Sequence, residues 1–408
     1  MSPPTTNSRG SRWAPPSPSQ RLRATLPVPD PPALLAVATR LVEQAGEYRW
    51  EGPDPFDGLW WNWPYPLVAT RRRRLVIFHV HARAPFDLRR LYRSRHPRLA
   101  KGLALFASAG LRISAQTGEE RIRALSIEAL ELLCADRRAG SLVWGYPFDT
   151  EHRWASYPAN TPSLVPTAFA VAALLEAERS TGRREFGDRA RAAGRWVLDE
   201  LWQPERGYFA YHARSPLNIH NANLLGAALA FTTLNEAARH AARAAVEASL
   251  VSQQRDGSWP YGDPSEDLGW ADSFHTGYVL RCLDQLEPVC AEIPEAIARG
   301  AEFYRRFFGP AGEARLWPNR PFPEDGHSGG TALSVLAMLY RRGLIDRDFL
   351  ERVAARFLAA GIRHGHVVHR RYRVGLRSAV SYLRWCDGHG ALGLADAAAA
   401  LASAADHG

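Results

Sequence analysis

The sequence predicts an all-α fold, an (α/α)6 toroid in which an inner ring of helices is surrounded by an outer ring. A polar turn that opens a helix recurs at a nearly constant spacing. It occurs at Asn218, at Asp272 and at Asp325, which are separated by 54 and 53 residues. A fixed period of this length indicates one repeated supersecondary unit. Segments with almost no charge alternate with segments that carry charge on one stripe, as expected of buried inner helices and amphipathic outer helices. Aromatic hairpin loops precede the inner helices.

The expected helices follow in pairs along the chain. The first spans residues 32–46, where apolar residues recur at helical spacing. The uncharged inner segments are 101–110, 161–175, 222–234, 273–280 and 328–340. The outer segments are 119–136, 185–201, 236–253, 292–308 and 346–360. A sixth inner helix is expected to start at Ser378, in phase with Asp325, and to close the ring. An open solenoid would need polar capping repeats, and none is evident.

Two stretches near the N-terminus do not follow the repeat. Residues 48–63 are too rich in Pro, Gly and Trp for regular structure and are expected to form a loop. Residues 71–81 begin with four arginines and continue with an apolar run that favours a strand, although the flanks suit a helix end. The arginines could mark a nucleic-acid or lipid patch, but a single short run is more typical of a solvated surface.

Composition sets the outer bounds of the prediction. Residues 1–30 are rich in Pro, Ser and Arg and are expected to be a disordered tail, which leaves one toroid domain over residues 31–408. The four cysteines have no paired spacing and are expected to be reduced core thiols. Neither a signal peptide nor a membrane span is evident, which favours a cytoplasmic protein without stable membrane insertion. The net charge of +9 suits an acidic partner, no nucleic-acid partner is expected, and the oligomeric state stays open.

In such a ring the polar loops before the inner helices converge at one end, where helix N-termini also offer free N–H groups. Polar side chains with acid, base or orienting roles are expected there. The candidate catalytic residues are Asp272, His275, Asp325, His327 and Asp149. Asp272 with His275 and Asp325 with His327 are expected to form two carboxylate–imidazole pairs on adjacent inner helices. The candidate substrate-binding residues are His220, Asn221, Asn218, Trp144, Tyr146, Trp259, Tyr261, Trp270, Tyr382 and Arg384. Some of the Asn and Asp residues also suit helix capping. Aromatic faces beside a polar floor suit saccharides, although such aromatics also wedge hairpins between helices.

Several chemistries fit these residues. An inverting glycoside hydrolase needs two carboxyl groups about 6.5–9.5 Å apart, which aspartates on different repeats could supply. A uronate lyase or epimerase needs a His or Tyr base and groups that neutralise the sugar carboxylate. A metal held by His220, His275, His327 and Asp325 is chemically allowed, but the spacing is weak evidence, so neither a metal nor a cofactor is expected. A binding protein that uses the same cavity without turnover is the alternative outside enzymes.

Longer motifs resemble one known family. They are Asp54-Pro-Phe-Asp57-Gly-Leu59, Gly145-Tyr-Pro-Phe-Asp149, Asn218-Ile-His220-Asn-Ala-Asn223, Asp256-Gly-Ser-Trp-Pro-Tyr-Gly-Asp263 and Asp272-Ser-Phe-His275-Thr-Gly-Tyr278. The chain is similar, from about residue 48 to 390, to bacterial exopolysaccharide- and capsule-biosynthesis proteins of toroid fold, often labelled prenyltransferase/squalene-cyclase-like. The resemblance implies a polysaccharide or glycolipid substrate, with a polyprenyl-binding or terpene-cyclase-like role as its alternative. It also implies a helix over residues 66–82. The chain departs from the family pattern at Arg384-Trp385-Cys386-Asp387-Gly388-His389.

Overall fold

The computed structural model describes residues 28–91, 96–140, 142–151, 155–213, 215, 217–234, 236–378 and 380–403. The first of these residues lead into helix α2 (Pro31–Glu47), which Asp30 caps by accepting a hydrogen bond from the Ala33 amide at 2.9 Å. The predicted tail over residues 1–30 lies outside the described residues up to position 27.

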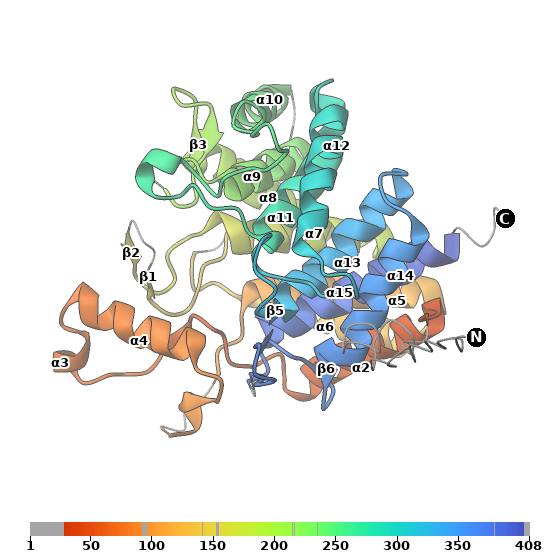
Figure 1. Ribbon diagram of the computed structural model, residues 1–408. Coiled ribbons are helices and arrows are strands. Elements are labelled where there is room, and N and C mark those ends of the chain that lie inside the picture. Colours follow the sequence, from red (N-terminus) through yellow and green to blue (C-terminus); the bar gives the residue numbers. More distant parts are fainter. Residues whose placement is uncertain are drawn as a thin grey trace, which may run out of the picture.

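Six inner helices form a closed ring (Figure 1). Each of them contacts the next along the chain, and the last contacts the first, which confirms the predicted toroid. Their bounds are α5 (Ala100–Thr117), α7 (Leu164–Thr181), α9 (His220–Thr233), α11 (Ser273–Leu286), α13 (Gly326–Arg341) and α15 (Gly388–Ser403). Every residue of α13 from Gly326 to Leu339 is buried, as expected of a helix that is apolar on every side.

The outer helices cover this ring. They are α2, α6 (Glu120–Ala135), α8 (Arg184–Leu201), α10 (Glu236–Leu250), α12 (Ile293–Tyr304) and α14 (Arg347–Arg356). Helix α8 shows why they lie outside, because Phe186, Ala190, Ala193 and Val197 form one buried stripe while its charged residues face away. Helix α2 packs against both α15 and α5, so it covers the point where the ring closes.

Small residues bring the last inner helices together. A Cβ on Gly330 would lie 2.6 Å from the backbone nitrogen of Gly390, and one on Gly393 would lie 2.2 Å from the carbonyl oxygen of Gly330. Real Cβ atoms do not approach backbone this closely, so glycine is required where α13 and α15 cross. At α13 and α15 the ring of inner helices is therefore held together by backbone contact and not by large side chains.

The predicted start of the sixth inner helix at Ser378 is wrong. Helix α15 starts at Gly388, directly after a π-helical turn, η7 (Leu383–Asp387). The connection from α14 is lengthened by the hairpin β6 (Ile362–Arg363) and β7 (His366–Val367) and by β8 (Arg370–Arg371), which pairs with β5 (Glu324–Asp325). These insertions break the 53-residue phase in the last repeat.

The strand expected within residues 71–81 is also wrong, because this segment is the helix α4 (Arg71–Arg83), as the family resemblance implied. Thr70 caps it by accepting a hydrogen bond from the Arg73 amide at 3.4 Å. Phe78 and His81, three residues apart, are its buried side chains, so only one face of the apolar run packs on the body of the protein. A short helix, α3 (Tyr65–Val68), precedes it.

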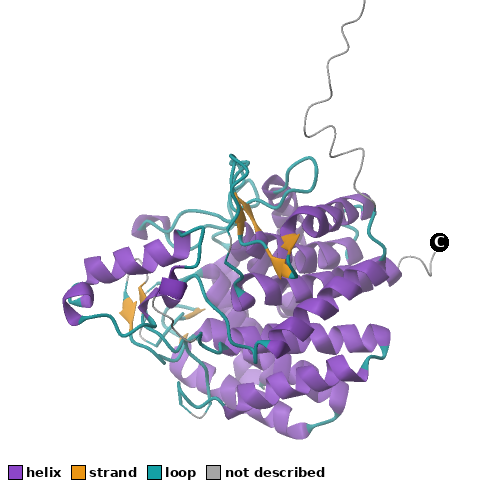
Figure 2. Ribbon diagram, turned by 90° about the horizontal axis from the view of Figure 1, so that it is seen from below, coloured by secondary structure: helices purple, strands orange, loops and turns teal. Residues whose placement is uncertain are grey.

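The remaining elements are short and lie in the connections (Figure 2). Two more hairpins pair β1 (Thr150–Glu151) with β2 (Ser156–Tyr157) and β3 (Trp202–Gln203) with β4 (Tyr208–Phe209). Single turns are η1 (Asp57–Leu59), η2 (Leu88–Leu91), η3 (Pro264–Glu266), η4 (Glu287–Val289), η5 (Arg305–Phe307) and η6 (Phe357–Gly361). All four cysteines are free thiols. None of the helices that the structure describes has both the length and the apolar character of a membrane span.

Candidate active site

Tyr278, on α11, is the centre of a polar cluster inside the ring. Its hydroxyl lies 2.9 Å from Nζ of Lys101, 2.7 Å from Nε2 of His327 and 3.0 Å from Nε2 of His389. These side chains come from α11, α5, α13 and α15, so four of the six inner helices meet at one phenol. Lys101, His327 and His389 are each the second residue of their helix. The matching positions place the three groups at one level of the ring.

Aromatic rings hold the two histidines in place. The imidazole of His327 stacks on that of His389 with a centroid separation of 4.5 Å, and on Phe274 at 4.3 Å. Trp385 meets the His327 ring edge-on at 4.0 Å. The Lys101 ammonium position lies 4.3 Å from the ring centre of Phe169. Rings packed in this way restrict rotation, so the cluster is preorganised.

Burial makes the neutral forms of the cluster more stable. It lowers the pKa of His327 and of His389 well below the usual value, and nearby cations act in the same direction. Burial also lowers the pKa of Lys101 well below its ordinary value, to which the charge of Arg384 adds. The pKa of the Tyr278 phenol is raised, mainly by burial. At neutral pH the ring therefore holds neutral imidazoles beside a protonated phenol.

Asp272 and His275 form a dyad at the start of α11. One oxygen of Asp272 caps the helix by accepting from the His275 amide at 3.0 Å, and the other lies 2.7 Å from Nδ1 of the same histidine. The His275 side chain is 24% exposed and lies with its ring centre 6.2 Å from that of Tyr278. The predicted pairing of these two residues is present, and His275 is the part of the array that solvent reaches.

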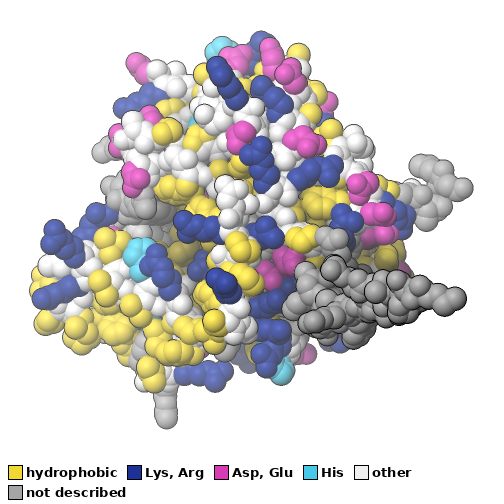
Figure 3. Space-filling view, in the orientation of Figure 1, with side chains coloured by type: hydrophobic (Ala, Val, Ile, Leu, Met, Phe, Trp, Pro, Cys, Tyr) yellow, Lys and Arg dark blue, Asp and Glu magenta, His cyan; other side chains and the backbone are white. Residues whose placement is uncertain are grey.

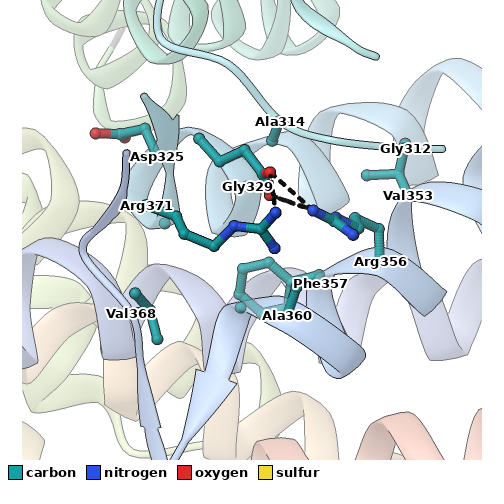
Figure 4. A pocket seen from close by; sticks show the side chains of 13 residues that line it. Gly312, Ala314, Asp325, Gly329, Val353, Arg356, Phe357, Ala360, Val368 and Arg371 are labelled. Atoms are coloured by element: carbon teal, nitrogen blue, oxygen red, sulfur yellow. Dashed lines mark hydrogen bonds and ion pairs between the residues drawn. The ribbon is translucent and has the colours of Figure 1, made fainter. Parts of the chain in front are cut away.

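The second expected carboxylate–imidazole pair, Asp325 with His327, is not present. Asp325 caps α13 by accepting from the Ser328 amide at 2.9 Å and pairs with Nε of Arg370 at 3.2 Å, whereas His327 turns to Tyr278. Figure 4 shows the Asp325 carboxylate pointing away from Arg356 and Arg371. Those two arginines bind Glu324 beside a small cavity of about 40 Å³ between α13 and α14, which is a structural ion-pair cluster.

Asp149 lies in the loop that leads to β1, and its hydrogen-bond partners are not members of the cluster around Tyr278. One of its oxygens accepts from the Ala159 amide at 2.7 Å, and the carboxylate pairs with Nη2 of Arg74 at 3.1 Å. Its side chain is 35% exposed. It therefore ties α4 to the hairpin β1–β2.

Two of the predicted sugar-stacking tryptophans are not available for stacking. Trp144 is 1% exposed and donates from Nε1 to the Leu133 carbonyl at 2.9 Å, and Trp259 is 2% exposed and donates to the Ser249 carbonyl at 3.0 Å. Both indoles wedge the hairpins against outer helices. Tyr261 and Trp270 are partly open and stack on each other at 4.8 Å, with Tyr261 also 4.6 Å from the His275 ring.

The predicted polar residues before α9 divide into two groups. His220 is buried, and its Nδ1 lies 3.2 Å from the hydroxyl of Ser249 on the outer helix α10. Asn221 lines a small cleft with Trp270 and His275, and its side-chain oxygen has no partner among the described residues. The side-chain oxygen of Asn218 is likewise buried without a partner there. His220 and Asn221 both line the cleft beside the dyad, whereas Asn218 does not.

Arg384 and Tyr382 differ in their surroundings. Arg384 is 3% exposed and binds Asp54 with two hydrogen bonds, one of them 2.7 Å long. Its guanidinium lies 5.3 Å from the ring centre of Tyr146, another candidate substrate-binding residue, which lies in the loop before α7. Tyr382 is fully buried and packs edge-on against His369 at 4.8 Å, and its hydroxyl has no partner in the described chain. Arg384 and Tyr146 therefore belong to the wall beside the cluster, and Tyr382 to the packing behind it.

The structure does not gather the residues of the metal alternative. In the described parts of the chain no three His, Cys, Asp or Glu side chains lie together as metal ligands. His220 contacts Ser249, His275 contacts Asp272, and Asp325 contacts Arg370, so these predicted ligands have separate partners.

Sequence reasoning missed three members of the cluster: His389, Lys101 and Tyr278. Gly388-His389 repeats the pair Gly326-His327 at the start of an inner helix, and this was the available sign. Lys101 is the only lysine of the chain and stands in a segment that is otherwise uncharged. His389, and not the predicted His220, joins His327 at the phenol, because His220 contacts Ser249 on the outer helix α10.

A cavity of about 340 Å³ opens on the other side of Tyr278. Its walls come from α5, α7, α9 and α11, with one residue of α15, and Ala and Leu make up nine of the twenty lining residues. Arg281, Gln285 and the ion pair of Arg112 with Glu176 (2.7 Å) add polar groups. Tyr278 and Phe169 line the inner end of this space, so the phenol adjoins a cavity as well as the histidines.

No family model and no curated protein matches the sequence. Solved structures do resemble the fold. Cellobiose 2-epimerase from Bacillus thermoamylovorans is 12% identical over 74% of this chain and 88% of its own, with a TM-score of 0.59. Unsaturated glucuronyl hydrolase from Bacillus sp. GL1, which degrades glycosaminoglycan, is 13% identical over 88% and 94%, with a TM-score of 0.58. A possible GH105 family member from Salmonella enterica is 11% identical over 95% and 99%, with a TM-score of 0.60. At these identities the likeness establishes the toroid fold.

Proposed function

We propose that this protein is a carbohydrate-active enzyme that moves a proton on a sugar carbon next to a carbonyl or carboxylate group, as an epimerase or lyase does. The observation that carries the proposal is the contact of one phenol with two imidazoles and an amine inside the ring. The pKa shifts keep both imidazoles uncharged at neutral pH, so a ring nitrogen is free to accept a hydrogen bond from the phenol.

Such a reaction needs a base, an acid and a group that stabilises the intermediate. A neutral imidazole removes the proton from the C–H bond, whose electron pair moves onto the adjacent carbonyl oxygen as an enediolate. The Tyr278 phenol or the Lys101 amine is placed to donate a hydrogen bond to that oxygen. Return of the proton to the opposite face gives an epimer, and departure of a substituent from the next carbon gives an unsaturated product. His275 is the partly exposed base, and Asp272 orients it.

Hydrolysis is less well supported by the same geometry. An inverting hydrolase needs a free acid and base about 6.5–9.5 Å apart. Asp272 and Asp325 instead cap helices, and Asp149 holds Arg74. These carboxylates have structural partners, whereas the imidazoles face the phenol.

Fold, charge and resemblance support a glycan substrate. Structures with this fold include a cellobiose 2-epimerase and hydrolases that act on unsaturated glucuronyl groups, so the fold accommodates both neutral and acidic sugars. The net charge of +9 favours the acidic class. A bacterial polysaccharide or its lipid-linked precursor in exopolysaccharide biosynthesis is the substrate that the sequence resemblance implies, and a cytoplasmic location would fit such a precursor.

Product analysis tests this proposal. Purified protein is incubated with reducing disaccharides and with acidic bacterial polysaccharides, and products are identified by NMR. We expect stereoisomers or unsaturated sugars, and a loss of about 10²-fold or more in rate in Tyr278→Phe. The matched control is His240→Gln, which changes an exposed histidine on α10 and should keep full activity. New reducing ends alone would show a hydrolase, and saturable binding without product would show a glycan-binding protein; each would overturn the proposal.

A further inference from the structure

Residues 60–91, which we call the arm, project from the side of the ring and include α3, α4 and η2 (Figure 1). Seven of the thirteen exposed large apolar side chains of the described chain lie in the arm. They are Trp61, Tyr65, Leu67, Val76, Val80, Phe86 and Leu91. Single exposed apolar residues are normal on a soluble protein, but a concentration on one projecting segment marks an interaction surface.

The exposure is large and confined to the outer side of the arm. Tyr65 is 77% exposed, Val76 62% and Leu91 80%. On the inner side Phe78 is 6% exposed and stacks on Phe56 at 5.2 Å. The arm is therefore held by its inner side, and its outer side has no covering element in the described chain.

The charge of the arm is strongly positive. Residues 60–91 contain seven arginines and one acidic residue, Asp87, which pairs with Arg89 at 3.3 Å. On α4 the exposed residues Arg73, Val76, Val80 and Arg83 are spaced by three, four and three positions, so basic and apolar side chains share one stripe. Figure 3 shows apolar and basic side chains gathered over α3 and α4 at the lower left.

We propose that the arm binds the surface of an anionic lipid bilayer. Apolar side chains enter the boundary between headgroups and acyl chains, while arginines on the same stripe contact the anionic headgroups. Trp61 and Tyr65 have the amphipathic rings that favour this boundary. The arrangement is interfacial, with the arm lying on the membrane, and it does not depend on the reaction proposed for the ring.

A second copy of the chain fits the arm less well. A two-fold dimer places the same patch of both partners face to face, so the arginines of one arm would meet those of the other. Like charges brought together oppose association, and the acidic residue of the arm, Asp87, is already paired with Arg89. An anionic surface satisfies the apolar and the basic groups at once.

Vesicle sedimentation with the full chain tests the proposal. One set of vesicles contains phosphatidylcholine with one-third phosphatidylglycerol, and the other contains phosphatidylcholine alone. We expect binding to the anionic set that weakens with salt, and at least about tenfold weaker binding for Val76→Ser/Val80→Ser. The matched control is Val251→Ser/Val374→Ser, which changes two valines that are 88% and 86% exposed outside the arm and should bind as the unchanged protein does.

A second variant tests the charge. Arg72→Ala/Arg83→Ala should bind the anionic vesicles more weakly and lose much of the salt dependence. Equal binding to both vesicle sets, equal loss in the control variant, or no binding at all would overturn the proposal. Sedimentation velocity that shows a dimer abolished by Val76→Ser/Val80→Ser, without vesicle binding, would assign the arm to self-association instead.

Discussion

At the scale of residues, burial decides what the histidines do. His327 and His389 have lowered pKa values because they are taken out of water, and their neighbours are an amine, a guanidinium and each other. The same burial lowers the pKa of His220 and of His212 to about 4. Burial alone does not separate a base in the cluster from a packing residue, because the difference lies in which side chains the fold brings next to each imidazole.

The lowered pKa values predict acid-sensitive stability. In the unfolded chain a histidine takes up a proton below about pH 6.5, but the buried histidines resist protonation until lower pH. The unfolded state therefore binds more protons, and stability falls as the pH drops from 6.5 towards 4. For a histidine shifted as His220 is, the free energy of unfolding should fall by about 2 kcal/mol between pH 7.5 and pH 5. Asp57, whose pKa is raised to about 6, acts in the opposite direction.

Urea unfolding at pH 7.5 and pH 5 checks this. His220→Gln should show a smaller fall than the unchanged protein, while the exposed control His240→Gln should show the same fall. Stability that is constant or rises between pH 7.5 and pH 5 would contradict the assignment of these histidines as neutral buried groups.

Prediction of site residues from the sequence was correct for the contact of Asp272 with His275 within one helix start, but it failed for His327. Asp272 and His275 are three positions apart, so helix geometry alone puts them together. The partner of His327 depends on which repeat lies across the ring, which a local pattern does not encode. Trp144 and Trp259 were misjudged for a similar reason, because an aromatic turn looks the same whether its ring faces the cavity or an outer helix.

At the scale of elements, two inner helices, α11 and α13, start on aspartate caps that also bind a second group. Asp325 caps α13 and pairs with Arg370 of β8, so one carboxylate joins the helix start to the strand pair β5–β8. Asp346 caps the outer helix α14 through the Phe349 amide at 2.7 Å and has no second partner among the residues that the structure describes.

This difference predicts unequal costs for the two caps. Asp346→Ala should lower the free energy of unfolding by about 1 kcal/mol, the usual value of an N-cap. Asp325→Ala should cost about 2–4 kcal/mol, because the mostly buried Arg370 also loses its carboxylate partner. Urea unfolding of both variants measures this; equal losses would show that the pair of Asp325 with Arg370 contributes nothing.

The element boundaries show where the repeat pattern is informative. Period and charge placed the inner and outer helices correctly, since burial on all sides or on one stripe follows directly from composition. Helix α4 and the start of α15 were misjudged. An apolar run of strand length does not distinguish a strand from a helix half buried by Phe78, and inserted hairpins leave no trace in the phase of the earlier repeats.

At the scale of the whole molecule, ring closure creates the site. The contact of α15 with α5 brings His389 to Lys101, which lie 288 positions apart, and no segment of the chain holds the cluster by itself. The cluster at the level of the helix starts and the cavity on the other side of Tyr278 use the same ring. The arm lies outside the ring, which allows a separate surface role.

The measurement that tests the central claim most directly is solvent deuterium exchange into a sugar. The protein is incubated in D2O with each substrate candidate, and mass spectrometry and NMR follow deuterium at carbon. We predict incorporation at the carbon next to the carbonyl or carboxylate, reduced about 10²-fold or more in His275→Gln and unchanged in the control His240→Gln. Turnover without deuterium at carbon, or full exchange in His275→Gln, would contradict proton transfer at the imidazole–phenol array.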